Sequence, residues 1–137
     1  MVLIISNPGT GKTRVIVELV YQHLKEHPEA RILVCADSNA VVDILATRIS
    51  SLDIGIIRVG HVARLPAHLI PFSVESRQAQ GLMGSEVFSD RPVVLATLTR
   101  CASPRGLGGS FDVLVVDEAG QAKVSITILF VFLYVHS

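Results

Sequence analysis

The chain has 137 residues, 50% of them hydrophobic, which is enough for one compact domain with a core of ordinary size. Its 12 Lys and Arg residues balance 12 Asp and Glu residues, so the composition excludes a strongly basic nucleic-acid binder, and any nucleic-acid site must be local. Two cysteines, Cys35 and Cys101, are too few for a disulfide framework, show no metal-ligand spacing with the histidines, and favour a reducing compartment.

Short apolar runs recur along the chain, separated by longer amphipathic stretches. Each run is about four residues long, mostly β-branched, and shows little polar alternation, which is typical of strands buried on both faces of a parallel sheet. The expected strands are Val2–Ile5, Ile32–Cys35, Ile56–Val59, Val93–Ala96 and Val113–Val116. The pattern therefore predicts an α/β fold, with one parallel sheet flanked by helices.

The first of these runs lacks the flanks of a signal peptide. No basic segment precedes it, and no small-residue cleavage site follows it. We therefore expect a strand there, and a protein of the cytoplasm or nucleus that is not secreted.

Two helices are predicted between the first three strands. The first covers Thr13–Lys25, where apolar residues recur at helical spacing, and Pro28 ends it. Its expected apolar face consists of Val15, Ile16, Leu19, Val20, His23 and Leu24. The second helix follows Asp37-Ser38-Asn39, residue types that cap the start of a helix, and continues with a similar apolar spacing from Val41 to Ile49.

Two segments fall outside this alternation. Residues 61–90 mix prolines and glycines with polar residues, and we expect an insertion or long connection outside the sheet. Residues 123–137 form an apolar tail that is shorter than the roughly twenty residues needed to cross a bilayer, so no membrane anchor is expected. The tail is interpreted as a last strand, or as a divergent end produced by a shifted frame or a premature stop.

The turn between the first strand and the first helix reads SNPGTGKT, from Ser6 to Thr13. Backbone N–H groups of such a loop, together with the helix start, can surround a polyphosphate, and its two glycines permit close approach and φ angles that other residues avoid. Lys12 would reach the β- and γ-phosphates, and the Thr13 hydroxyl would ligate Mg²⁺. The predicted ATP and Mg²⁺ site comprises Pro8, Gly9, Thr10, Gly11, Lys12 and Thr13.

This loop departs from the strict phosphate-binding pattern at one position. Ser6 stands where the pattern G-x-x-x-x-G-K-[ST] has its first glycine. If that position needs a positive φ, the serine costs about 1 kcal/mol. A simple glycine-rich turn remains the alternative interpretation.

Two adjacent carboxylates follow the last predicted strand. A nucleotide site of this type needs an acidic residue on the metal side and a base that orients the attacking water. Asp117 is the candidate for the first role and Glu118 for the second, with Lys12 as their phosphate-binding counterpart. The alternative is an ordinary solvated strand end.

Four stretches, in this order and spacing, resemble motifs I, Ia, Ic and II of superfamily 1 helicases. They read NPGTGKT, RILVCADSNAVVDILATRI, VVLATLTRCAS and FDVLVVDEAGQA. The similarity is to the Upframeshift-like branch, which includes the Mov-ten/Armitage and immunoglobulin-mu-binding types. It implies an incomplete RecA-like P-loop NTPase lobe over residues 1–122, with ATP hydrolysis coupled to unwinding in the complete family.

The resemblance also implies roles for polar residues outside the loop. Ser38 and Asn39 of motif Ia, with Thr97 and Thr99 of motif Ic, would contact the backbone of single-stranded RNA or DNA without reading its sequence. Gln121 would sense the γ-phosphate region. Each residue has a plainer alternative: a helix cap for Ser38 and Asn39, a strand end for Thr97, and a solvated loop position for Gln121.

The chain also departs from the family pattern. The upstream adenine-recognising Gln, motif III and the second RecA-like lobe with its arginines are not found in this sequence. Since such arginines stabilise the transition state of phosphoryl transfer, we expect this chain to bind nucleotide, and to need a second lobe as its partner for turnover and unwinding.

Two other functions stay open: a P-loop ATPase of the AAA+ type, and a non-catalytic truncated product. About a hundred residues, including motif Ia, separate Lys12 from Asp117, which favours the helicase. A GTPase is not expected, because the sequence has no Asn-Lys-x-Asp motif.

Overall fold

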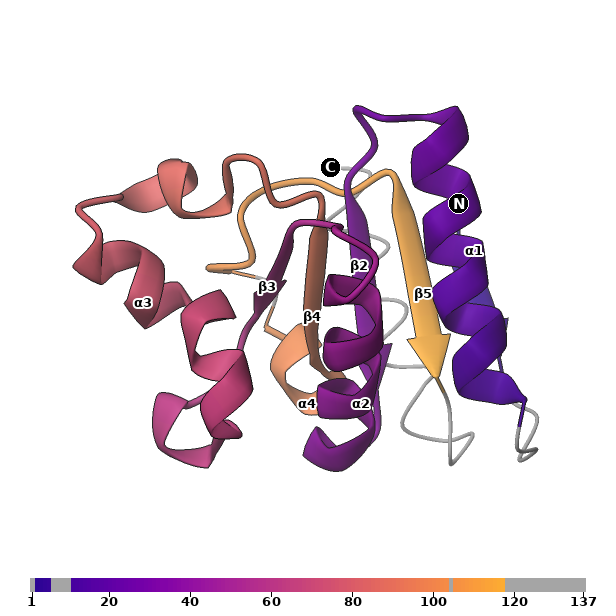
Figure 1. Cartoon of the computed structure of the whole chain (residues 1–137), viewed down its shortest axis with the longest axis horizontal. Coiled ribbons are helices and arrows are strands. Elements are labelled where there is room, and N and C mark those ends of the chain that lie inside the picture. The colour runs from indigo at the N-terminus through magenta and orange to yellow at the C-terminus, as the bar shows by residue number, and fades with distance from the viewer. Residues whose placement is uncertain (1, 6–10, 104, 118–137) are drawn as a thin grey trace.

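Five short strands form one sheet in which all neighbouring strands are parallel (Figure 1). The computed structural model describes residues 2–5, 11–103 and 105–117. Within them the strands are β1 (Val2–Ile5), β2 (Ile32–Ala36), β3 (Ile56–Arg58), β4 (Val93–Thr97) and β5 (Val113–Asp117), in the spatial order β1-β5-β2-β4-β3. The predicted α/β class, with one parallel sheet and flanking helices, is confirmed.

The register of the strands aligns four chain positions along the carboxyl edge of the sheet. Asp117 at the end of β5 pairs with Ile5 of β1 on one side and with Ala36 of β2 on the other, and Ala36 pairs with Thr97 of β4. The predicted phosphate-binding residues come after Ile5 in the chain, and Ser38 and Asn39 of motif Ia come after Ala36. The segments that the sequence singled out therefore leave the sheet at the same edge, where parallel α/β sheets bind ligands.

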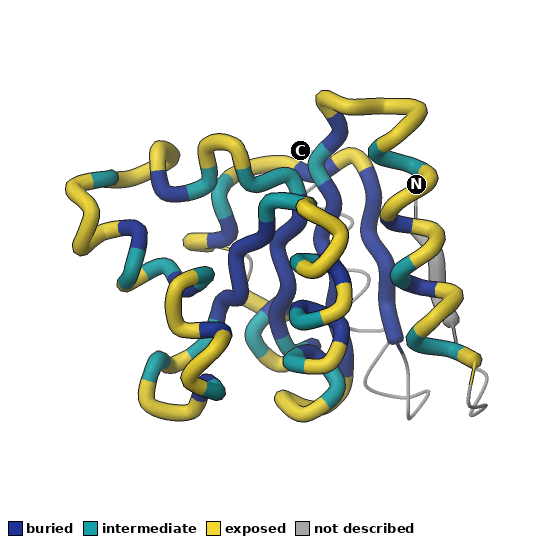
Figure 2. The backbone as a smooth tube through the Cα atoms, viewed as in Figure 1, coloured by how far each residue is buried: buried dark blue, intermediate teal, exposed yellow. Residues whose placement is uncertain are grey.

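Two long helices cover one face of the sheet. They are α1 (Lys12–Glu26) and α2 (Asn39–Ser50), which lie in front of the strands in Figure 1. Their inward side chains pack on alternate strand residues such as Ile32, Val34 and Val115. Figure 2 shows the result as dark strands behind helices whose outer surfaces are exposed.

The apolar face of α1 is narrower than predicted. Ile16 and Val20 are buried against the sheet, whereas Val15 is 49% and Leu19 is 38% exposed. Val15 and Leu19 form one row with helical spacing, and Ile16 and Val20 form another. Only one row can point at the strands, because neighbouring residues differ by about 100° around a helix.

The other face of the sheet carries less regular structure. Helix α4 (Leu98–Cys101) and the segment that leads to β5 supply Leu98, Leu107 and Phe111 to a second core. This core packs on the remaining strand residues, including Leu33 and Leu114. Strands β2 and β5, and β4 as far as Ala96, are therefore buried on both faces, as their continuous apolar runs predicted.

Between β3 and β4 the chain forms four short helices and no strand, at the left of Figure 1. They are η1 (Val62–Arg64), η2 (Ala67–Phe72), α3 (Val74–Ala79) and η3 (Gly84–Phe88). The Arg77 guanidinium closes this connection by donating from Nε to the Val87 carbonyl and from Nη2 to the Ser89 carbonyl, at 3.1 and 2.8 Å.

No helix in the described ranges is long and apolar enough to cross a membrane. The predicted apolar tail, residues 123–137, lies outside these ranges.

Candidate functional site

The fold brings Lys12 and Asp117 together, although 105 positions separate them (117 minus 12). Lys12 begins α1, and Asp117 ends β5 on the sheet face that α1 covers, because Val113, Val115 and Asp117 alternate onto that face. Lys12 Nζ and Asp117 Oδ1 form an ion pair whose side chains are only 14% and 10% exposed. An ammonium and a carboxylate thus lie side by side at the carboxyl edge of the sheet, next to the start of a helix.

The start of α1 suits an anionic ligand. Gly11, its N-cap residue, makes no side-chain cap, and the first helical turn contains no acidic residue. Apart from its chain neighbours and the backbone of its own helix, no described atom lies within 4 Å of the point where a Cβ on Gly11 would stand. Uncapped N–H groups at a helix start attract phosphate, and Thr13 stands half-buried in the first turn.

One expectation about this turn is wrong for Gly11. Its φ is −93°, in the right-handed region that any residue adopts, so the conformation does not require glycine. The open space beside its Cα is the remaining reason for a glycine there, because a side chain would occupy the approach to the backbone.

Several predicted site residues lie outside the described residues: Pro8, Gly9 and Thr10 of the loop, with Glu118 and Gln121 after β5. The substituted pattern position, Ser6, lies outside them too.

The proposed strand-contact residues lie on two neighbouring helix starts. Ser38 caps α2 by accepting a hydrogen bond from Val41 N at 3.2 Å, and Thr97 caps α4 by accepting from Arg100 N at 3.3 Å. Ser38, Asn39 and Thr99 are exposed, and Thr97 is partly exposed. The cap role weighed in the sequence analysis is therefore present for Ser38, and Thr97 is both the last residue of β4, as weighed there, and the cap of α4.

A buried arginine reaches the same helix start. Arg58, the last residue of β3, is 1% exposed and contacts Asn39 and Asp43 of α2. The sequence analysis missed it, although one signal was present: a charged residue inside an apolar run that was predicted to be buried on both faces.

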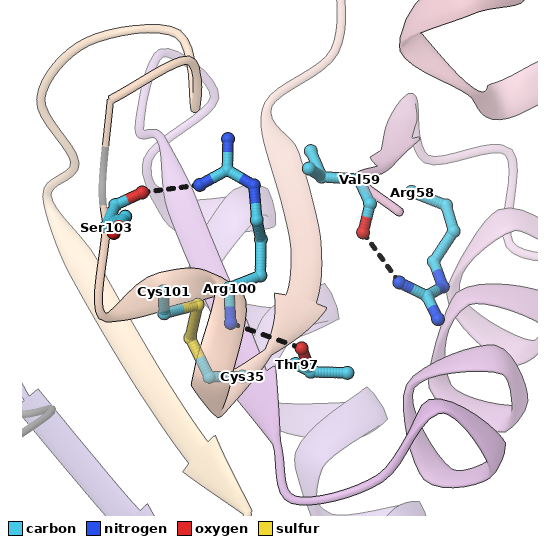
Figure 3. The surroundings of a disulfide bond; sticks show 7 residues. All are labelled: Cys35, Arg58, Val59, Thr97, Arg100, Cys101 and Ser103. Carbon is cyan, nitrogen blue, oxygen red and sulfur yellow. Dashed lines mark hydrogen bonds between the residues drawn. A yellow bond between two sulfur atoms is a disulfide. The ribbon is translucent and has the colours of Figure 1, made fainter. Parts of the chain in front are cut away.

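A disulfide between Cys35 and Cys101 lies beneath these helix starts (Figure 3). It joins β2 to α4, and both cysteines are fully buried in the second core. Two cysteines are too few for a disulfide framework, as the sequence analysis stated, but they form this one cross-link, which that analysis did not predict. The pairing could not be foreseen, because the 66-residue separation is closed only by the β2–β4 pairing and by the helix that follows β4.

A family model described as "AAA domain" matches residues 1–85, more than half of the chain. Similar curated proteins include DNA polymerase alpha-associated DNA helicase A of Schizosaccharomyces pombe, 36% identical over 75% of this chain. Others are DNA-binding protein SMUBP-2 of Mesocricetus auratus, 37% identical over 68% of the chain, and RNA helicase Mov10l1 of Mus musculus, 31% identical over 85%.

The chain belongs to the superfamily 1 helicases, in the Upframeshift-like branch. It spans only 16%, 8% and 10% of the length of these three relatives. Because relatives named as helicases match 75% and 85% of the chain, the AAA+ ring ATPase is not favoured.

Proposed function

We propose that this chain is the nucleotide-binding lobe of an ATP-dependent helicase, binding ATP with Mg²⁺ at the start of α1. The observation that carries the proposal is the Lys12–Asp117 pair beside a helix start whose N-cap residue, Gly11, has no side chain. Lys12 would hold phosphate oxygens, and Asp117, with the Thr13 hydroxyl, would face the cation. Bound ATP supplies the bond whose hydrolysis powers strand separation in such proteins.

Single-stranded nucleic acid is the proposed second ligand. Four short polar side chains lie at the starts of α2 and α4, which follow the neighbouring strands β2 and β4 at the edge of the proposed nucleotide site: Ser38, Asn39, Thr97 and Thr99. Such groups suit contacts to phosphate and sugar. Relatives are named for DNA and for RNA, so both are proposed as substrates. A location in the cytoplasm or nucleus is proposed as well.

Turnover is proposed to require a second RecA-like lobe as partner. Arginines of such a lobe would stabilise the transition state of phosphoryl transfer. Glu118 and Gln121, proposed as base and γ-phosphate sensor, complete the catalytic set.

Nucleotide binding is tested with a fluorescent, non-hydrolysable ATP analogue and Mg²⁺. Lys12→Ala removes a charge-assisted contact to phosphate and is expected to weaken binding by at least about tenfold. Lys25→Ala is the matched control, because Lys25 is an exposed lysine in the last turn of the same helix, and it is expected to leave affinity unchanged. Circular dichroism establishes that both variants are folded.

Equal affinity of the Lys12→Ala variant and the unchanged chain would contradict the proposal. Retention of single-stranded RNA without any nucleotide binding would instead support a passive nucleic-acid binder.

A further inference from the structure

Arg58 places a full positive charge inside the fold, under the start of α2. A buried charge is tolerated only where acceptors compensate it. Arg58 Nε donates to Asp43 Oδ1 at 2.8 Å, Nη1 to the Val59 carbonyl at 2.7 Å, and Nη2 to Asn39 Oδ1 at 2.9 Å. Figure 3 shows the contact with Val59. Each of the three guanidinium nitrogens therefore donates to a separate acceptor, which fixes the orientation of the group.

This network fixes the orientation of the Asn39 amide. A guanidinium has hydrogen-bond donors and no acceptor, so Asn39 must turn its oxygen toward Arg58. Its Nδ2 group then points away from Arg58. Asn39 is exposed, and no acceptor for Nδ2 is found among the residues that the structure describes. The exposed Nδ2 group of Asn39 is thus a hydrogen-bond donor whose direction is fixed by the buried Arg58 guanidinium.

We propose that Arg58, anchored by Asp43, is a positioning residue that aims the Asn39 N–H group at the phosphate backbone of a bound single strand. The inference rests on the proposed nucleic-acid function of this edge. Phosphate oxygens accept hydrogen bonds and never donate them, so an outward oxygen on Asn39 would be useless to them, whereas an outward N–H group fits. The contact binds any sequence, because it reads no base.

Holding the amide in place also limits the entropy lost on binding. A free Asn side chain rotates about two bonds, and a strand would have to stop that rotation. In this chain the hydrogen bond from Arg58 already restricts the rotation of the Asn39 side chain before a strand binds.

If the network only tied β3 to α2, Asn39→Asp would leave strand binding unchanged. The proposal makes a different prediction for this substitution. A carboxylate accepts from Arg58 at least as well as an amide oxygen does, so the fold keeps or gains stability. The same substitution replaces the outward N–H group with an oxygen. Stability and strand binding should therefore change in opposite directions, or binding alone should fall.

The first experiment measures binding of fluorescein-labelled oligouridylate and oligothymidylate to the full chain at low salt. Asn39→Asp is expected to weaken binding by at least about tenfold, since it loses a hydrogen bond to a charged group and adds a repulsive charge. Its urea midpoint is expected to be unchanged or higher. Gln78→Glu is the control, because it makes the same chemical change at an exposed position of α3.

The second experiment tests whether Arg58 acts through Asn39. Lysine offers no planar fork, so Arg58→Lys releases the amide while keeping the charge. The variant is expected to bind as weakly as Asn39→Ala, and the double variant no more weakly than either. In two-dimensional NMR spectra of the chain, Arg58→Lys should also shift the Asn39 side-chain NH₂ resonances.

The outcomes separate the inference from the proposed function. If the unchanged chain binds neither oligonucleotide, the nucleic-acid function fails and the inference fails with it. If the chain binds but Asn39→Asp binds equally well, only the inference is overturned. Additive losses of affinity for Arg58→Lys and Asn39→Ala would also overturn it, because a residue acting through Asn39 cannot contribute once Asn39 is gone.

Discussion

The Lys12–Asp117 pair gives the most direct test of the site geometry, and it needs no ligand. Removing one partner of a fully buried pair costs about 3–5 kcal/mol, whereas exposed pairs contribute about 0–1 kcal/mol. With side chains 14% and 10% exposed, this pair lies nearer the buried limit. We therefore expect Asp117→Asn to lower the free energy of unfolding by about 2–3 kcal/mol.

The assay is urea denaturation of a double-mutant cycle, followed by far-ultraviolet circular dichroism. The cycle combines Asp117→Asn with Lys12→Met, and subtracting both single effects from the double effect isolates the interaction of the two side chains. A coupling energy of about 1–2 kcal/mol is expected. Glu29→Gln, at an exposed position before β2, controls for loss of a negative charge and is expected to change stability by less than about 0.5 kcal/mol.

A coupling energy below about 0.3 kcal/mol would refute the reasoning, because independent sites are additive within that margin. The two charges would then not meet in solution, and the proposed nucleotide site would lose its central observation.

Three further predictions concern the elements that support the site. Ser38→Ala removes the N-cap of α2 and is expected to cost about 1 kcal/mol in the same urea assay. Gly108→Ala is expected to destabilise the fold by more than about 1 kcal/mol, because φ is +93° and a Cβ would stand 2.5 Å from the Phe88 ring, and thermal unfolding would detect this. Reducing the Cys35–Cys101 disulfide should cost about 4 kcal/mol for its 66-residue loop, compared by urea denaturation with and without reductant and checked by intact mass. Unchanged stability after reduction would show that the cross-link does not form.

The positions of strands and long helices could be predicted from local patterns. A run such as Val113–Val116 is apolar at every position, and only a strand covered on both faces buries all of it. The capping residue types at Ser38 and Asn39 likewise marked the start of α2. These features depend on neighbours within one turn or one strand, so the order of the residues carries the information directly.

The chemistry-bearing residues could be recognised in part. The types and spacing of Lys12, Thr13 and Asp117 indicated a nucleotide site, because polyphosphate and Mg²⁺ demand a cation, a hydroxyl and a carboxylate. Arg58 was overlooked, since its role depends on Asn39 and Asp43, which stand on a different element.

The amino-acid sequence by itself determined the five strands and the two long helices, that the sheet is parallel, and which family the motifs resemble. Only the tertiary structure decided that β5 lies between β1 and β2, which places Asp117 beside Lys12. It alone selected the buried row of α1, paired Cys35 with Cys101, and put the guanidinium of Arg58 under α2. The reason is physical: secondary structure follows from short-range sterics and hydrophobic spacing, whereas strand order and buried partners follow from contacts between segments far apart in the chain.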